Sequence, residues 1–448
     1  MLLNPFAPSE IAGLPEDFFG RRQELHILER ALDQGSVALQ GGIGIGKSSL
    51  LARIRLLMEG FDSSHSSKSV IAVGDKDVKT VDDAARLILE AFIHIDEVFN
   101  KVQFKLGPIF EIESTEVCSY FKTGRHLAAL KRIVENEYME TALAGKEFLI
   151  LAIDEADKCP VPIARLIRSL ITHTQQNGVK NVRFIVAGVS PFFQAMVDED
   201  AGINRFFYKT ITLLPLPKEE ATELVETKLI KAIRDAEKRN ISLRVDPTII
   251  ARVVDLSGGH PHLLQLLGSH LIEREDADPD GIINSQDLVS ALRKICYEDR
   301  ARVYTSTIHL LELHDMLEPL KNLFDYASTR FPTKINRSKA KQVASKKSIE
   351  WLITNNILSV LTDEEYGLID EFLRIRMLMD EVDQESEARN LEKRLVELGS
   401  LEDEERLETR AKRHRHLDDD STEQDFDDEE DNDSSDDEED DDEKSWRG

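Results

Sequence analysis

The sequence lacks any apolar run of the roughly 18 to 20 residues that span a bilayer. It has only three cysteines, Cys118, Cys159 and Cys296. An odd number of widely separated cysteines does not suggest a disulfide framework or a CxxC metal site. The first residues, MLLNPFAPSE, have neither the basic flank nor the long apolar core of a secretion signal. These absences argue against a membrane protein and predict a cytoplasmic one.

Acidic residues outnumber basic ones, 85 against 57, which gives a net charge of −28, and this excess is unevenly distributed. Residues 417–448 hold 19 Asp or Glu against Lys444 and Arg447. A segment so acidic and so poor in aromatics cannot bury enough surface to fold, so we expect a disordered tail. Residues 381–416, highly charged with sparse leucines, predict an exposed helix. The tail either keeps the protein soluble or docks on a basic surface.

The remaining chain has room for two or three domains, with a hydrophobic content of 41% over 448 residues. Short apolar runs alternate with helical stretches up to Leu216, a pattern typical of a parallel sheet covered by helices. The sequence therefore predicts an α/β core over residues 1–216. The expected strands are SVALQ (36–40), SVIAV (69–73), FLILAI (148–153), RFIVAG (183–188) and KTITLL (209–214).

After Leu216 the pattern changes to consecutive amphipathic helices, which predict an all-α domain over 217–299. Over 300–380, three helices and a strand-turn-strand outline a winged helix. Its expected elements are HLLELHDMLEPLKNLFDYA (309–327), NRSKAKQVA (336–344), KKSIEWLITNNIL (346–358) and LSVLTDEEYGLID (358–370).

The stretch GGIGIGKSSL follows the first expected strand and precedes a helix. Gly41, Gly46, Lys47 and Ser48 fit GxxxxGK[ST], in which glycines let backbone N–H groups point at phosphate oxygens. Lys47 is expected at the β- and γ-phosphates and Ser48 on Mg²⁺. The full set expected around ATP is Gly41, Gly42, Ile43, Gly44, Ile45, Gly46, Lys47, Ser48 and Ser49.

The run FLILAIDEAD is apolar throughout, as in a strand buried on both faces, and ends in Asp154 and Glu155. Carboxyl ends of strands are where open α/β sheets bind ligands. We expect Asp154 to hold Mg²⁺ and Glu155 to orient or deprotonate an attacking water. The alternative is a pair of solvated acids at a helix start. The letters DEAD do not indicate an RNA helicase, because no second α/β domain or HRxGR-type motif follows.

Together these motifs resemble the AAA+ ATPases, specifically the STAND signalling ATPases and the related archaeal origin-recognition initiators. Besides the two motifs above, the resemblance rests on DFFGRRQELHILERAL (17–32), FIVAGVS (184–190) with NRFFYKTITLLPLPKEEATELV (204–225), and LSGGHPHLLQLLGSHL (256–271). It covers roughly residues 15 to 375 and implies a P-loop core, a helical lid and a winged helix.

The resemblance implies further site residues. Gly20 and Arg21 begin a helix whose start lies against the adenine, and Pro261 packs on the base. Ser190 takes the place of a γ-phosphate sensor, and Arg205 that of an arginine acting on a γ-phosphate. The plainer alternatives are a helix N-cap serine and a surface arginine.

The lid departs from the initiator pattern. Initiators carry an arginine that reaches the γ-phosphate, where this sequence has only His260 and His262. The departure favours the STAND branch, and the histidines are expected to be lid residues rather than metal ligands.

The resulting prediction is an Mg²⁺-dependent ATPase acting as a nucleotide-controlled switch, with a homo-oligomer or a regulatory protein as partner. The alternatives are a DNA-binding ATPase of the replication-initiator or transposition-helper type, a processive motor, and a scaffold that binds nucleotide without hydrolysis. The 300–380 segment either binds DNA or packs on the ATPase as a brake. Its basic residues are Lys334, Arg337, Lys339, Lys341, Lys346 and Lys347.

Overall fold

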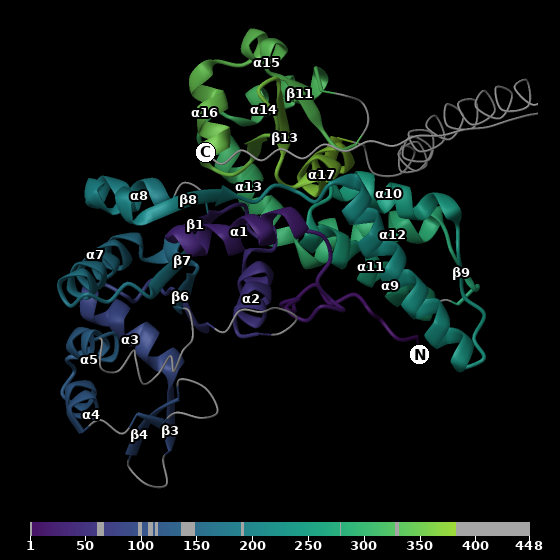
Figure 1. The fold of residues 1–448 in the computed structure, drawn as a ribbon. Helices are drawn as coiled ribbons and strands as arrows, with labels where there is room; N and C mark the ends of the chain where they lie inside the picture. The colour runs from purple at the N-terminus through teal and green to yellow at the C-terminus, as the bar shows by residue number, and fades with distance from the viewer. Residues whose placement is uncertain are drawn as a thin grey trace, which may run out of the picture. The chain divides into compact units, whose positions relative to one another are not determined.

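A computed structural model of the chain describes residues 2–60, 67–96, 101–105, 111–112, 115–135, 148–189, 192–277, 279–327 and 331–381 (Figure 1). Contacts divide the chain into two units, Met1–Val396 and Glu397–Gly448. All described residues belong to the first unit. The expected charged helix and acidic tail therefore lie outside the described residues, and the domain boundaries inside the first unit stay predictions.

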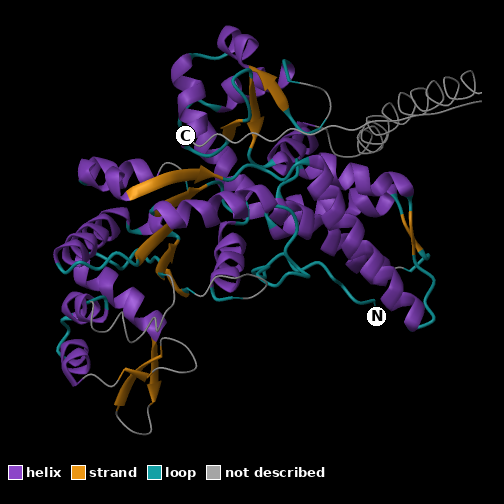
Figure 2. Ribbon diagram, viewed as in Figure 1, coloured by secondary structure: helices purple, strands orange, loops and turns teal. Residues whose placement is uncertain are grey.

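A five-stranded sheet forms the N-terminal core (Figures 1 and 2). Its strand order is β2-β6-β7-β1-β8, and every neighbouring pair is parallel. Ala38 of β1 pairs with Val186 of β7 on one side and with Thr210 of β8 on the other. The bounds are β1 Ser36–Gln40, β2 Lys68–Val73, β6 Leu149–Asp154, β7 Val182–Gly188 and β8 Phe207–Thr212. The α/β prediction is confirmed, and all five strands match within about two residues.

Helices cover both faces of this sheet because alternate strand residues point to opposite sides. On β6, Leu149, Leu151 and Ile153 join one apolar cluster, whereas Ile150 and Ala152 join another. The first cluster packs under α3 Val81–Phe92, α5 His126–Ile133, α7 Pro160–Gln176 and α8 Phe192–Glu199. The second packs under α1 Arg22–Gln34 and α2 Lys47–Met58. The sheet is therefore the middle layer of three.

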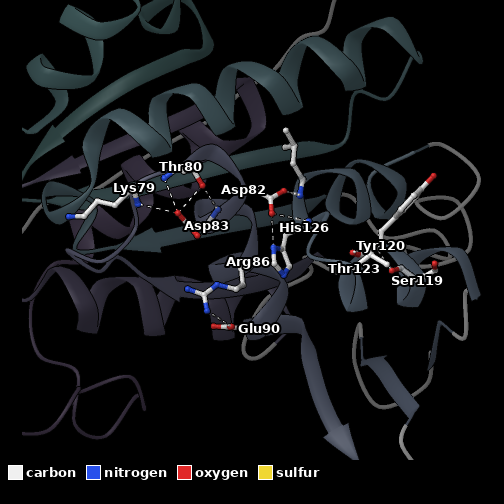
Figure 3. A network of polar contacts seen from close by, with 11 residues as sticks. Lys79, Thr80, Asp82, Asp83, Arg86, Glu90, Ser119, Tyr120, Thr123 and His126 are labelled. Atoms are coloured by element: carbon white, nitrogen blue, oxygen red, sulfur yellow. Dashed lines mark hydrogen bonds and ion pairs between the residues drawn. The ribbon is translucent and has the colours of Figure 1, made fainter.

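An insertion follows α3 that the sequence analysis did not anticipate. It contains the antiparallel strands β3 Ile93–Asp96, β4 Lys101–Lys105 and β5 Glu111–Ile112, then α4 Thr115–Lys122. Asp82 of α3 ties the start of α5 to the core: its carboxylate accepts from the backbone N–H groups of His126 and Leu127 and lies 2.7 Å from His126 Nδ1 (Figure 3). Thr80 and Asp83 cap α3 reciprocally beside it.

Helices dominate after the sheet, as predicted. α9 Lys218–Lys238, α10 Pro247–Ser257, α11 Pro261–Ala277 and α12 Ser285–Lys294 share one apolar cluster, and a π-helical turn, Ile295–Asp299, extends α12. Two short parallel strands, β9 Arg244–Val245 and β10 Ile282–Ile283, lie between them. Asp246 caps α10, and Asn284 with Asp287 forms a capping box on α12.

The C-terminal module begins at α13 Ala301–Leu313. A single helix was expected over 309–327, and this was wrong: α13 ends and a separate α14, Leu317–Asp325, follows. The break lies at Asp315, which has a left-handed φ of 57°. The remaining elements are β11 Lys334–Asn336, α15 Arg337–Val343, α16 Lys346–Thr354, β12 Leu358–Val360, β13 Glu365–Leu368 and α17 Glu371–Glu381. The expected strand-turn-strand is present, with β11 added as a third antiparallel strand in the order β11-β13-β12.

Glu371 is a buried carboxyl at the start of α17, only 2% exposed. Its Oε1 accepts from Thr333 N at 2.8 Å, and Thr333 Oγ1 lies 2.5 Å from its Oε2. Arg374 Nη1 in turn donates to Thr333 Oγ1 at 2.9 Å. Burial outweighs these favourable contacts and raises the pKa of Glu371 to about 7 from its ordinary 4.5.

Because the folded state binds this proton more tightly than the unfolded state, stability should fall as pH rises from about 4.5 to about 7 and level off above. We expect Glu371→Gln to remove this component, on the order of 3 kcal/mol. Urea unfolding of both proteins at half-unit pH steps measures it. Parallel stability curves for the two proteins across that window would contradict the assignment.

Among the described residues, no helix combines the length and the apolar character needed to cross a membrane.

Candidate functional site

The loop from Gly41 to Ser48, called the phosphate loop below, connects the end of β1 to the start of α2. Gly44 and Gly46 adopt left-handed φ values of 74° and 98°, which glycine tolerates and other residues rarely do. These turns reverse the chain within a few residues. As a result, the N-terminus of α2 follows at once at Lys47.

Nearly all carbonyl groups of the phosphate loop accept a hydrogen bond. Lys47 Nζ donates to Gly41 O at 2.9 Å and to Gly42 O at 2.8 Å. The remaining acceptors are Ile43 O, 3.0 Å from His260 Nε2, Ile45 O, which accepts from Arg21 Nη2 at 3.1 Å, and Gly46 O, which accepts from Leu50 N at 3.0 Å.

The backbone N–H groups of the same loop contrast with its carbonyls. Within the described part of the chain, none of the N–H groups of residues 42–46 has an acceptor. A run of N–H groups at a helix N-terminus attracts anions. The loop is therefore built as an anion cradle, with its oxygen atoms directed elsewhere.

Lys47 is a buried cation, 9% exposed. Burial lowers its pKa, opposed by the charges of Asp154, Asp157 and Glu155. Its ammonium group has only carbonyl oxygens within hydrogen-bond distance among the described residues. An anion placed in the loop would therefore gain a charge-assisted partner.

The two serines after Lys47 have different partners. Ser48 Oγ donates to Asp154 Oδ2 at 2.5 Å and so joins the loop to the end of β6. Ser49 Oγ instead accepts from the N–H of Ala12 at 3.1 Å, which ties α2 to the N-terminal segment. Of the two, only Ser48 faces the carboxylate.

Glu155 follows Asp154 with a left-handed φ of 50°, an uncommon conformation for this residue type. Its N–H donates to Asp154 Oδ1 at 2.9 Å, and its side chain pairs with Lys158. Gly74 allows this turn, because a Cβ at Gly74 would lie 2.5 Å from Glu155 O. The turn holds Asp154 against the loop and leaves the Glu155 carboxylate, 46% exposed, on the cavity wall.

Arg21 is 3% exposed, hydrogen-bonds the phosphate loop and lines the adjoining cavity. Its Nη1 pairs with Glu24 at 2.7 Å, and its N–H donates to Glu220 Oε2 at 3.1 Å. Gly20 before it packs against Glu220, where a Cβ would lie 2.4 Å from Oε2. Arg21 thus supports the loop at Ile45 O, a contact that the sequence analysis did not anticipate, and its assignment to the nucleotide stays a prediction.

A cavity of about 830 Å³ opens beside the loop. The sequence analysis foresaw its walls at the phosphate loop, Asp154, Glu155 and Pro261. It missed a wall formed by residues 3–12, which no motif or periodicity signals. Lid side chains hold this segment: Lys228 Nζ donates to Pro5 O at 2.7 Å, Gln265 Oε1 accepts from Ala7 N at 3.1 Å, and Phe6 packs on Gly268.

The start of α11 contacts the phosphate loop directly. A Cβ at Gly44 would lie 2.9 Å from His262 Cβ and 3.0 Å from His260 Cε1. His262 Nδ1 lies 3.1 Å from Pro8 O, and Pro261 and His262 line the cavity. Gly259 permits this approach, because the backbone of Leu216 packs so closely against it that a Cβ at Gly259 would meet Leu216 O at 2.3 Å.

The two sensor predictions have different outcomes. Ser190 lies outside the described residues, although Val189 before it is held by its N–H donating to Asp157 Oδ1 at 2.9 Å. Arg205 lies in the last part of the 3₁₀ turn Ala201–Phe206, is exposed, and has its guanidinium carbon 5.1 Å from the centroid of the Phe206 ring. Arg205 is not among the described residues that line the cavity.

A magnesium ion fits the donor set beside the loop. Ser48 and Asp154 offer hard oxygen atoms, which Mg²⁺ prefers. No group of three or more His, Cys, Asp or Glu side chains within the described ranges is placed to hold a metal alone. This suits an ion bound through one carboxylate together with substrate phosphates.

Comparison with known proteins gives matches only among solved structures. No protein-family model and no curated protein matches the chain. The Walker-type ATPase of Pyrococcus abyssi matches with a TM-score of 0.53 at 14% identity, covering 83% of this chain and 99% of its own. The ORC2 protein of Aeropyrum pernix, in ADPNP and ADP complexes, matches with a TM-score of 0.51 at 14% identity, covering 84% and 98%.

The fold is that of an AAA+ P-loop ATPase. CDC6P of Pyrobaculum aerophilum also matches, with a TM-score of 0.47 at 16% identity, covering 89% of this chain and 98% of its own. In this chain, β7 lies between β1, which leads into the phosphate loop, and β6, which ends in Asp154. Since all three strands are parallel, their carboxyl ends meet at one edge of the sheet, where the cavity opens.

Proposed function

We propose that the chain binds ATP with Mg²⁺ and hydrolyses it, and that the bound nucleotide sets the state of a regulatory switch. One observation carries the proposal: the phosphate loop turns its carbonyls toward Lys47, Arg21 and His260 and leaves its N–H groups for an anion. The AAA+ fold supports it, as does the nucleotide bound to ORC2.

In this proposal the chain's own groups bind and orient the phosphates. The N–H groups of residues 42–48 receive phosphate oxygens, and Lys47 exchanges its bonds to Gly41 O and Gly42 O for the β- and γ-phosphates. Ser48 and Asp154 hold Mg²⁺, which when bound neutralises charge on the phosphates. The base and ribose occupy the part of the cavity between residues 3–12 and Pro261.

Glu155 is the group we assign to the attacking water. Its carboxylate lines the cavity beside Asp154 and can accept a hydrogen bond from water, and then its proton. In the structure Lys158 pairs with it. Hydrolysis therefore requires the Glu155 side chain to turn from Lys158 toward the γ-phosphate.

The switch is assigned to the lid, residues 217–299. Its helix α11 touches the phosphate loop at Gly44. Just before and at its start, Gly259, His260 and Pro261 form a Gly-x-Pro sequence that resembles the GxP element of STAND proteins. A ligand that contacts both core and lid favours the conformation in which both contacts are made. Ser190 as a γ-phosphate sensor remains part of this proposal, as does Arg205 acting either on a neighbouring subunit's nucleotide or on its own γ-phosphate.

A DNA-binding ATPase is the second candidate. We assign the C-terminal module, with its helices and three-stranded antiparallel sheet, to the winged-helix class. Exposed lysines on β11, α15 and α16 favour DNA, and among them only Lys346 has a carboxylate partner in the described residues, Glu350 at 3.5 Å. Phosphate contacts of this kind give salt-dependent affinity. The exposed set is Lys334, Lys339, Lys341, Lys346 and Lys347.

The test is Mg-ATP binding and turnover by the full chain, with molecular mass followed with and without ATP, and a salt titration of duplex DNA binding alongside. Binding with slow turnover and an ATP-dependent change in mass or compactness supports the switch. Absence of ATP binding by the full chain would contradict the proposal. Tight, salt-sensitive DNA binding would favour the second candidate.

The adjacent serines allow a sharper test of the magnesium assignment. We expect Ser48→Ala to weaken ATP affinity roughly tenfold in Mg²⁺ and little in EDTA, because only Ser48 faces Asp154. Ser49→Ala, which loses a bond to Ala12 N instead, is the matched control and should keep the full Mg²⁺ dependence. Isothermal titration with and without Mg²⁺ measures both. Equal responses of the two variants would contradict the assignment.

A further inference from the structure

His260 is the one side chain from beyond residue 216, among those described, that hydrogen-bonds a phosphate-loop carbonyl. It precedes α11 and is 4% exposed, with Nε2 lying 3.0 Å from Ile43 O. Because a carbonyl oxygen carries no proton, Nε2 must be the protonated nitrogen and the donor in this contact. A side chain 217 positions along the chain thus sets the orientation of one loop peptide.

The surroundings of His260 favour a neutral ring. Burial lowers the pKa of His260 to about 3, and the neighbouring His262, Arg300 and Arg21 act in the same direction, against the bond to Ile43. In a neutral ring with its proton on Nε2, Nδ1 is an acceptor. Nδ1 is buried without a partner within the described residues, so the ring's one donated bond goes to the loop.

The peptide group that His260 holds, Ile43–Gly44, lies where its orientation would affect a bound anion. Ile43 precedes Gly44, whose left-handed φ of 74° reverses the chain at the centre of the cradle. The His260 and His262 side chains both pack against Gly44, so the lid contacts this part of the loop through two residues. A carbonyl free to turn inward would direct negative charge at the phosphates.

We propose that His260 is a positioning residue that holds the Ile43 carbonyl outward, so that lid placement sets the affinity of the phosphate loop for the nucleotide's phosphates. The inference rests on the proposed function and extends it. His260 does not touch the reacting atoms. Its contribution lies in the ground-state binding of ATP and ADP alike.

The expected result follows from the loss of one buried hydrogen bond. His260→Leu should raise the Kd of both ATP and ADP by roughly 3- to 10-fold, with turnover at saturating ATP within about twofold of wild type. His260→Gln places an amide N–H near the position of Nε2 and should restore affinity. His260→Asn is one methylene shorter, cannot reach Ile43 O, and should behave like the leucine variant.

Nucleotide titrations and steady-state kinetics of the four full-length proteins make the test, with thermal unfolding without nucleotide as the check on folding. If the leucine variant unfolds, the comparison of nucleotide Kd values between His260→Gln and His260→Asn still tests the proposal. Wild-type Kd values in His260→Leu or His260→Asn, or an equal loss in His260→Gln, would overturn this inference alone. Failure of the wild type to bind ATP would overturn the proposed function as well.

Discussion

Lys47→Ala is expected to abolish ATP binding, with the Kd rising more than about 100-fold. Lys47 is the buried cation at the centre of the phosphate loop, and its hydrogen bonds to described residues go only to Gly41 O and Gly42 O. Removing it leaves bound phosphates without their nearest positive charge in a site where Asp154, Asp157 and Glu155 are all negative. Titration with a fluorescent ATP analogue and equilibrium dialysis measure the loss.

Lys209→Ala is the matched control, because Lys209 lies exposed on the edge strand β8 and carries the same charge. It should bind ATP as wild type does. The Lys47→Ala chain should also unfold no earlier than wild type, since burial already penalises its charge. ATP binding retained within a fewfold in Lys47→Ala would contradict the assignment of the anion cradle.

Glu155→Gln should bind ATP within about threefold of wild type while turnover falls by roughly 100- to 10,000-fold. The amide keeps the size of the side chain and can still contact water, but it cannot accept a proton. Asp154 keeps its bonds to Ser48 and to the N–H of residue 155, so the metal and phosphate contacts remain. Phosphate release under single-turnover and steady-state conditions separates binding from chemistry.

Glu199→Gln is the matched control for Glu155→Gln. Glu199 lies at the end of α8, where it pairs with Arg165 at 2.7 Å, and it does not line the cavity in the described part of the chain. Its turnover should equal that of wild type. Turnover near the wild-type rate in Glu155→Gln would show that another group acts on the water.

The sequence predicted the sheet well for a physical reason. Strands such as 148–153 are buried on both faces and therefore read as continuous apolar runs. The phosphate loop and the Asp154–Glu155 pair were also predictable, because each is a local motif whose chemistry depends on a few adjacent residues.

The missed features depend on contacts between distant segments. The cavity wall at residues 3–12 is held by Lys228, His262 and Gln265, at separations above 200 residues, and no periodicity records such contacts. Arg21 was expected beside the nucleotide and lines the cavity, but its bond to Ile45 O depends on how the loop folds and was not predicted. The break at Asp315 follows from one left-handed residue in an otherwise helical pattern.

The dependence of the Ile43 carbonyl on His260 has a consequence for how the protein is made. Synthesis proceeds from the N-terminus at about 5 to 20 residues per second, so the phosphate loop leaves the ribosome about 10 to 40 seconds before its lid partner. During that interval the sheet can form while one loop carbonyl is unrestrained. We expect a ribosome-bound chain ending before residue 260 to bind ATP more weakly than the released protein, so that tight binding begins only after the lid has been translated.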